Sequence, residues 1–292
     1  MNNTTISFPG LGIGEFTLNK IAISLFDGAI TVRWYALFIC TGILLAYFYF
    51  INRGKNKEGI DEDNLINIVL FVVPIAIIGA RLLFVLTSDI KYKSFMDVIA
   101  IWEGGLAIYG AIIFGFLTVV VYSKVKRINL LKVLDAICPA VLIGQILGRW
   151  GNFFNGEAFG SSANVSFIPW RMVVNGVETH PTFFYESFWN FIGFIIANIL
   201  YKNKKFNGQI FTFYIAWYGF GRGWIEMLRT DSLYVGNLKL MVILGFGCFV
   251  VGTVLYIYLL NKEKKTQSDI NEYKKYIDSK KINKDSIDEV KE

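Results

Sequence analysis

The segment GRWGNFFNGEAFG, residues 148–160, concentrates side chains that could bind an anion, directly after a long apolar run. Arg149 and Asn152 are three residues apart and can share one helix face, and Asn155 and Glu157 follow. Glycines are interspersed at Gly148, Gly151, Gly156 and Gly160. Glycine lets the backbone turn or approach a ligand closely. A guanidinium group can grip two phosphate oxygens at once, so the segment predicts an anion site. A plain polar cap at a helix end is the alternative.

A second charged cluster lies in GFGRGWIEMLRTDS, residues 219–232. Arg222, Glu226 and Arg229 stand at i, i+4 and i+7, so one helical stripe carries positive, negative and positive charge. Glu226 could hold both arginines and leave guanidinium N–H groups free for a ligand. Arginines from two separate helices suit an anionic lipid headgroup, and a self-contained salt-bridge stripe is the alternative.

Three shorter motifs add candidate residues. Tyr35 lies in RWY at 33–35, Tyr109 lies in WEGGLAIYGA at 102–111, and His180 opens HPTFFYE with Glu186 at its end. An interfacial aromatic belt would also explain Tyr35, and close helix packing would explain the glycines near Tyr109. A structural cap would explain His180.

Arg81, in GARLL, lies near the outer end of an apolar run. Charge at membrane depth costs about 2.5–3.5 kcal/mol on insertion scales, so it needs a purpose. We expect Arg81 to contact a headgroup or to pair with Glu186 or Glu226.

The composition excludes several other sites. With a single histidine, the chain cannot form a zinc site that needs several imidazoles, and no H-E-x-x-H helix occurs. Cys40, Cys138 and Cys248 lie far apart within apolar runs and indicate neither disulfides nor a metal cluster. No basic patch is interleaved with aromatics, so nucleic acid is not an expected partner. We expect neither a metal nor a cofactor.

The elements that position these residues are apolar helices. Of the 292 residues, 54% are hydrophobic and only 18% charged, against about 25% charged in soluble chains. Apolar runs of about 18 residues or more predict membrane-spanning helices. Seven such spans are predicted, at 33–51, 64–86, 104–122, 130–147, 182–201, 208–225 and 237–260. The sequence therefore predicts an all-α membrane protein with a transmembrane domain over 1–260.

Basic residues predict the orientation. Lysines and arginines cluster after the first, third, fifth and seventh spans, which the positive-inside rule places in the cytoplasm. The N-terminus is then outside, and the charged tail, 261–292, is cytoplasmic. This tail could form a surface helix or be disordered. The candidate site residues gather at the outer side.

In this order, the motifs resemble the prolipoprotein diacylglyceryl transferase family of bacteria. The segment 148–160 is similar to that family's signature throughout, and RWY at 33–35, GAR at 79–81, HP with YE at 180–186, and the cluster ending at Asp231 support the resemblance. The resemblance implies transfer of a diacylglyceryl group from phosphatidylglycerol to the lipobox cysteine of a prolipoprotein signal peptide, with release of glycerol phosphate. It also implies a multi-pass protein of the cytoplasmic membrane with its site toward the outer leaflet.

The resemblance further implies roles for individual residues. Arg149 and Arg222 would handle the phosphate, with Asn152, Glu157, Gly160, Tyr35, Glu226 and Arg229 completing the lipid site. Candidates for the group that takes the thiol proton are Glu157, Glu226, His180 and Tyr109. Many family members have histidine at position 109, and a phenol, with an ordinary pKa near 10, is a poor base. Phe183 also stands where the family usually has glutamine. A transporter or flippase for an anionic lipid or small anion is the alternative function.

Overall fold

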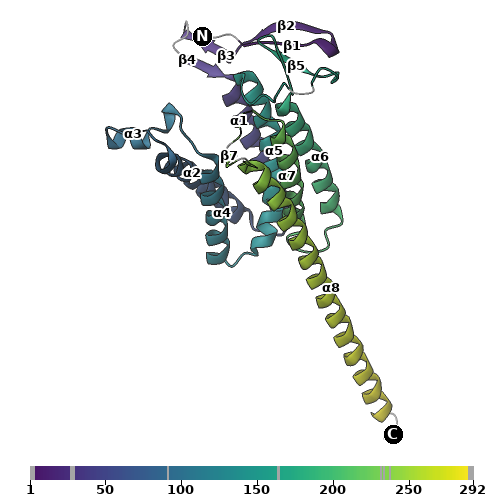
Figure 1. Ribbon diagram of the computed structural model, residues 1–292. Helices are drawn as coiled ribbons and strands as arrows, with labels where there is room; N and C mark the ends of the chain where they lie inside the picture. Colours follow the sequence, from purple (N-terminus) through teal and green to yellow (C-terminus); the bar gives the residue numbers. More distant parts are fainter. Residues whose placement is uncertain are drawn as a thin grey trace.

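The computed structural model describes residues 4–26, 30–90, 92–162, 165–230, 232, 234–236 and 238–288. Asp231, which ends the second charged motif, lies outside these residues. The structure is mostly helical (Figure 1). Its helices are α1 Trp34–Asn56, α2 Glu62–Thr87, α3 Phe95–Ile99, α4 Ile108–Val125, α5 Leu130–Asn155, α6 Thr182–Lys202, α7 Gln209–Met227 and α8 Leu240–Asp288, with short 3₁₀ turns at Pro9–Leu11 and Ile101–Glu103.

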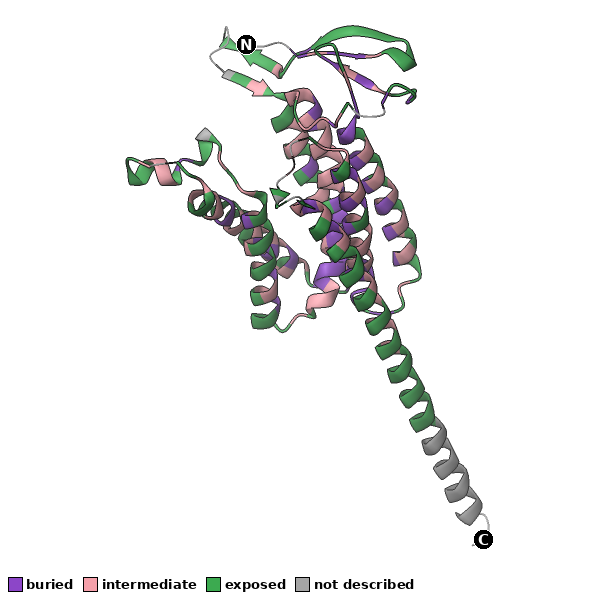
Figure 2. Cartoon of the chain, in the orientation of Figure 1, coloured by how far each residue is buried: buried purple, intermediate pink, exposed green. Residues whose placement is uncertain are grey.

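Six of the described helices are long and apolar enough to cross a membrane: α1, α2, α4, α5, α6 and the Leu240–Lys274 part of α8. α7 matches the sixth predicted span, but its C-terminal half carries Arg222 and Glu226. Many apolar side chains along α1, α2, α4 and α8 are exposed, as expected of surfaces that face lipid (Figure 2). The helical, membrane-embedded character of the chain is therefore confirmed.

The helices pack as neighbouring pairs, with α1 against α5, α2 against α4, α5 against α6 and α7 against α8. α2, α3 and α4 lie to one side of the bundle, and α8 runs away from it past the ends of the other helices (Figure 1). The α2–α4 contact is very close, because a Cβ at Gly110 would lie 2.2 Å from the carbonyl oxygen of Gly79. The predicted charged tail, from residue 261, continues α8 as a helix as far as Asp288.

Short strands lie before α1 and in later connections between helices, so the all-α expectation was incomplete. β1 Thr4–Phe8, β2 Ile13–Leu18, β5 Met172–Val174 and β6 Val177–Thr179 form an antiparallel sheet of order β2-β1-β5-β6. Two further hairpins pair β3 Ile21–Leu25 with β4 Ile30–Arg33, and β7 Tyr234–Val235 with β8 Leu238–Lys239. A search for long apolar runs does not detect strands this short.

The four-stranded sheet is fixed to the ends of α5 and α6. Ile6 and Met172 of the sheet are fully buried in one apolar cluster with Phe153 of α5 and Phe183 of α6. Phe183, the departure from the family pattern, thus has a structural role, with its ring 4.6 Å from that of Phe153. The sheet therefore covers the helix ends that carry the signature segment.

At the opposite end of the bundle, Asp135 of α5 caps the start of α7. Its carboxylate is fully buried and accepts hydrogen bonds from the amides of Gly208, Ile210 and Phe211 at 2.7–2.9 Å. Lys204 lies 2.7 Å from this carboxylate and 2.6 Å from Glu58. The first amides of a helix lack partners within it, so Asp135 satisfies donors that Gly208 cannot cap with a side chain.

We predict that Asp135→Ala destabilises the protein strongly, because Lys204 is left partly buried with one partner fewer and the first amides of α7 lose their acceptor. Removing one partner of a buried pair costs about 3–5 kcal/mol. Unfolding of purified protein in detergent measures the change. Asp61→Ala, which removes an exposed cap from α2, is the matched control with an expected loss of about 1 kcal/mol. Equal effects of the two variants would contradict the assignment.

Candidate active site

Glu186 is the centre of the charged cluster where the C-terminal ends of α5 and α7 meet the N-terminal end of α6. One carboxylate oxygen pairs with Nη2 of Arg149, and the other lies 3.0 Å from Nη1 of Arg222. The Glu186 side chain is 2% exposed, whereas the two arginines retain 22% and 18%. The carboxylate therefore joins guanidinium groups from two separate helices, and both arginine side chains stay partly exposed.

The second motif continues this network along α7. Oε2 of Glu226 lies 2.6 Å from Nη2 of Arg222 and 3.7 Å from Nε of Arg229. Glu226 therefore pairs with both arginines as predicted, but α7 ends at Met227, so Arg229 reaches Glu226 from beyond the helix and not as the third member of a helical stripe. Lys239 closes the end of the helix, since its ammonium group donates to the carbonyls of Glu226, Met227 and Arg229 at 2.6–3.1 Å.

The signature segment adds a chain of amide contacts at the edge of the cluster. Arg149 donates to Oδ1 of Asn152 at 3.3 Å, which confirms that the two share a helix face. Nδ2 of Asn152 donates in turn to Oε1 of Glu157 at 3.0 Å, and Nδ2 of Asn155 donates to the same oxygen at 3.2 Å. Gly156 ends α5 in a left-handed conformation with φ of +68°, which turns Glu157 back toward the helix. Glu157 is exposed.

Gly160 brings three connections together. Its amide donates to the carbonyl of His180 at 2.9 Å, and it forms a backbone bridge with Arg229. A Cβ at this position would lie 2.5 Å from the Cβ of His180, so glycine is required for the close approach. The structure thus gives Gly160 a packing role, and its predicted contact with lipid stays a prediction.

His180 and Tyr109 differ in their surroundings. The buried imidazole of His180 has Nδ1 3.4 Å from the hydroxyl of Tyr185. The Tyr109 hydroxyl contacts Sδ of Met241 on α8, and its side chain lies within electrostatic range of Arg222 and Glu226. Tyr109 is therefore beside the cluster, although its own hydroxyl bonds elsewhere.

Tyr35 packs closely on the signature helix. A Cβ at Gly151 would lie 2.8 Å from its ring, so α1 approaches α5 at a point that only glycine allows. Tyr35 is 38% exposed. The ring is therefore accessible, and its predicted contact with lipid stays a prediction.

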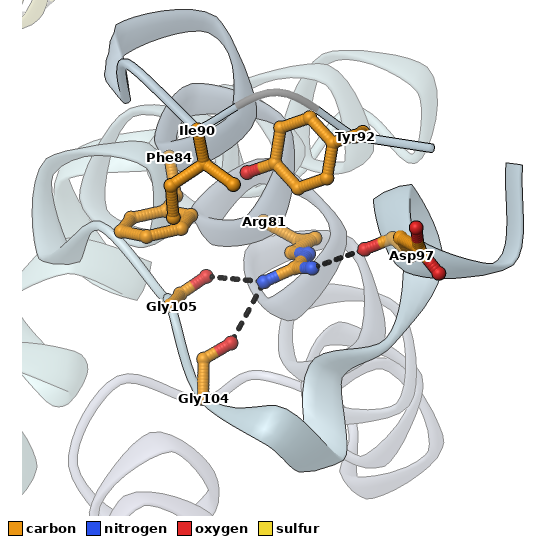
Figure 3. A pocket seen from close by; sticks show the side chains of 7 residues that line it. All are labelled: Arg81, Phe84, Ile90, Tyr92, Asp97, Gly104 and Gly105. Atoms are coloured by element: carbon orange, nitrogen blue, oxygen red, sulfur yellow. Dashed lines mark hydrogen bonds between the residues drawn. The ribbon is translucent and has the colours of Figure 1, made fainter. Parts of the chain in front are cut away.

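The expected pairing of Arg81 with Glu186 or Glu226 was wrong, whereas its contact with a headgroup stays a prediction. Its guanidinium donates to four backbone carbonyls, those of Asp97, Val98, Gly104 and Gly105, at 2.6–3.1 Å (Figure 3 shows three of these residues). All four belong to the α2–α4 connection, so Arg81 pairs with neither Glu186 nor Glu226. A small cavity of about 280 Å³ beside it is lined by Phe84, Ile90 and Tyr92 (Figure 3).

The same connection carries its own local support. The Ser94 hydroxyl and the Lys93 amide donate to Asp97 and hold the pKa of that carboxyl below its ordinary value. Arg81 and the glycine contacts of α2 and α4 then fix the start of α4. Motif GAR and the segment before Tyr109 are therefore one structural unit that positions Tyr109.

Glu186 was predicted as part of the HPTFFYE motif and as a possible partner of Arg81, and its place between Arg149 and Arg222 was missed. A glutamate one helical turn into an apolar span was the available signal, because such a charge needs buried partners. Its partners could not be named without knowing that α5, α6 and α7 pack together. Within the described residues, no group of three or more histidine, cysteine or acidic side chains could hold a metal ion.

We predict that Arg81→Lys loosens the α2–α4 connection, because one ammonium group cannot serve four carbonyls. Each hydrogen bond from a charged group contributes about 1.5–3 kcal/mol. Amide hydrogen exchange over 97–105 should therefore accelerate by about tenfold or more, as measured by mass spectrometry in detergent. Arg171→Lys, which alters an ion pair on the sheet, should leave this segment unchanged. Unaltered exchange in Arg81→Lys would refute the anchoring role.

Comparison with known proteins agrees with this arrangement. A family model described as "Prolipoprotein diacylglyceryl transferase" matches residues 20–258. A protein of Lysinibacillus sphaericus is 42% identical over 276 residues, covering 90% of this chain and 97% of the relative. Proteins of Finegoldia magna and Clostridioides difficile are 40% and 38% identical, covering 82% and 86% of this chain and 95% and 100% of the relatives. All three are named phosphatidylglycerol–prolipoprotein diacylglyceryl transferase.

Proposed function

Because the chain belongs to the prolipoprotein diacylglyceryl transferase family, we propose that the Glu186 cluster is its catalytic centre. The enzyme transfers the diacylglyceryl group of phosphatidylglycerol to the lipobox cysteine of a prolipoprotein signal peptide. The observation that carries this assignment is the pair of guanidinium groups, from α5 and α7, joined by one buried carboxylate. The relatives' names describe transferases, so a transporter or flippase is not favoured.

The two arginines bind the phosphate of the donor lipid. Arg149, Arg222 and Arg229 contribute three positive charges against the buried carboxylates of Glu186 and Glu226. With Lys239 at the same end of α7, the cluster carries a positive excess, which suits the anionic phosphodiester of the lipid. Bidentate guanidinium contacts favour phosphate oxygens over other anions. Asn152, Gly160, Tyr35 and Arg229 complete the lipid site.

The chemical step is an alkyl transfer. The cysteine thiolate attacks the glyceryl carbon that carries the phosphate, a carbon–sulfur bond forms, and the carbon–oxygen bond to glycerol phosphate breaks. Charge grows on the departing phosphate, where Arg149 and Arg222 stabilise it. Their positive charge also favours ionisation of the thiol, whose ordinary pKa is about 8.5.

Glu157 accepts the thiol proton. It is exposed, and its carboxylate accepts hydrogen bonds from the neutral side-chain amides of Asn152 and Asn155. Glu226 is occupied by two arginines, and the Tyr109 hydroxyl is directed to Met241. His180 lies beside Tyr185, within the backbone junction around Gly160.

The site faces the outer leaflet of the bacterial cytoplasmic membrane. Asp135, near the start of α5, pairs with Lys204 of the basic connection between α6 and α7. Arg149 lies fourteen residues further along α5. At 1.5 Å per residue this separation is about 21 Å, most of an apolar bilayer core. With the basic connections in the cytoplasm, seven spans place the N-terminus outside and the tail inside.

We predict that Arg149→Gln and Arg222→Gln each lower kcat for transfer to a lipobox peptide by about 10²- to 10³-fold, because each removes charge stabilisation from the leaving phosphate. Mass spectrometry of the peptide with and without phosphatidylglycerol measures the diacylglyceryl adduct. Arg171→Gln removes an arginine from an ion pair outside the cluster and should transfer normally. Near-normal transfer by either cluster variant would refute the two-arginine site. Absence of an adduct with folded wild-type protein would refute the function.

We predict that Glu157→Gln lowers transfer by about 10²-fold at pH 7, because a general base contributes about 10²–10⁴-fold. Glutamine keeps the oxygen that accepts from the two asparagines, so the local geometry is retained. Without the base the thiol must ionise in solvent, so the deficit should shrink as the pH rises through about 8.5. A pH profile parallel to that of the wild type would exclude Glu157 as the proton acceptor.

A further inference from the structure

Two tryptophans join α6 to α7 just inside the charged cluster. The rings of Trp189 and Trp217 are stacked, with centroids 4.2 Å apart and planes inclined by 12°. The indole N–H of Trp189 donates to the carbonyl of Trp217 at 3.0 Å, and that of Trp217 donates to the carbonyl of Trp189 at 3.0 Å. The two hydrogen bonds are therefore reciprocal: each tryptophan donates to the carbonyl of the other.

Each helix contributes the same four-residue spacing, Trp-x-x-x-Gly, as WNFIG at 189–193 and WYGFG at 217–221. A Cβ at Gly193 would lie 2.4 Å from Nε1 of Trp217, and a Cβ at Gly221 would lie 2.1 Å from Nε1 of Trp189. Each indole thus lies on the glycine one turn beyond the opposite tryptophan. We call these four residues the tryptophan clasp.

The clasp fixes the axial register of the two helices. A carbonyl oxygen has two lone pairs, so each tryptophan carbonyl can accept an indole N–H in addition to its helical amide. Sliding α6 by one residue along α7 would move the groups by about 1.5 Å. A shift of that size takes a 3.0 Å hydrogen bond well outside its normal range, and both bonds would break together.

The same register determines the distance between Glu186 and Arg222. Glu186 lies three residues before Trp189 on α6, and Arg222 directly follows Gly221 on α7. Oε2 of Glu186 and Nη1 of Arg222 meet at 3.0 Å, a distance that tolerates little sliding. Glu186 in turn holds Arg149, so the placement of all three charged groups depends on how α6 and α7 are aligned.

We propose that the tryptophan clasp is a positioning device for transfer, which holds Arg222 and Glu186 in register for the phosphate. This inference rests on the function proposed above. Trp189 and Trp217 touch no reacting atom and act through the charged pair. The clasp therefore affects binding of the lipid donor and leaves recognition of the peptide unchanged.

The test uses Trp189→Phe and Trp217→Phe, which keep an aromatic ring and remove one indole N–H. We expect kcat/KM for phosphatidylglycerol to fall about tenfold, mostly through KM, with KM for the lipobox peptide unchanged. Near-UV circular dichroism should lose the signal of the stacked indoles. Phe188→Leu, which alters a lipid-exposed ring stacked on Phe184 of the same helix, is the matched control and should retain wild-type constants.

A double-mutant cycle separates positioning from plain stabilisation. If the clasp acts through Glu186, its loss adds little in a Glu186→Gln background, because coupled residues are not additive. Additive losses, equal losses toward lipid and peptide, or unchanged kcat/KM in both phenylalanine variants would overturn the proposal.

Gly221→Ala provides a second approach should a phenylalanine variant fail to fold. Its methyl group displaces the Trp189 ring, whereas Gly247→Ala adds a methyl in open space on α8. Only the former should raise KM for phosphatidylglycerol, and equal constants in the two variants would also overturn the clasp. Failure of the proposed function is distinct, because wild-type protein would then form no adduct. In that event, phosphatidylglycerol binding to the same variants in nanodiscs gives the readout.

Discussion

A carboxylate that is almost wholly buried needs compensating charge, and Glu186 obtains it from two directions at once. Leaving one partner of a buried ion pair uncompensated costs about 3–5 kcal/mol. Glu186 therefore needs both Arg149 of α5 and Arg222 of α7 to compensate its charge. The end of α5, the start of α6 and the end of α7 must therefore lie at the same level of the bundle, with these three side chains directed toward one another. The sheet on the ends of α5 and α6, the Asp135 cap at the start of α7 and the tryptophan clasp all serve that alignment.

The helices could be predicted because membrane-spanning segments are long and apolar, and the two charged motifs stood out against that background. The i, i+4 pair of Arg222 and Glu226 needs only helical geometry and followed from spacing, whereas Arg229 meets Glu226 from the connection after α7. Glu186 was different, because a bridge between two arginines depends on which helices pack together. Spacing within one helix carries no such information.

Arg81 shows a second limit of sequence reasoning. A charged residue at membrane depth suggested a charged partner, whereas its four partners are backbone carbonyls. Carbonyls are the same at every position, so no residue type in the sequence marks them. The strands escaped prediction for a related reason, since elements of two to six residues depend on packing partners more than on their own pattern.

The backbone contacts around Gly160 have a mechanical consequence for the transferase. Gly160 bonds to His180 and bridges Arg229, while Ser161 donates to the carbonyl of Leu228 and accepts from the amide of His180. Three connections, distant in sequence, thus share one hydrogen-bonded junction over the charged cluster. A displacement of the connection at 160–161 would therefore break its backbone hydrogen bonds to both of the others.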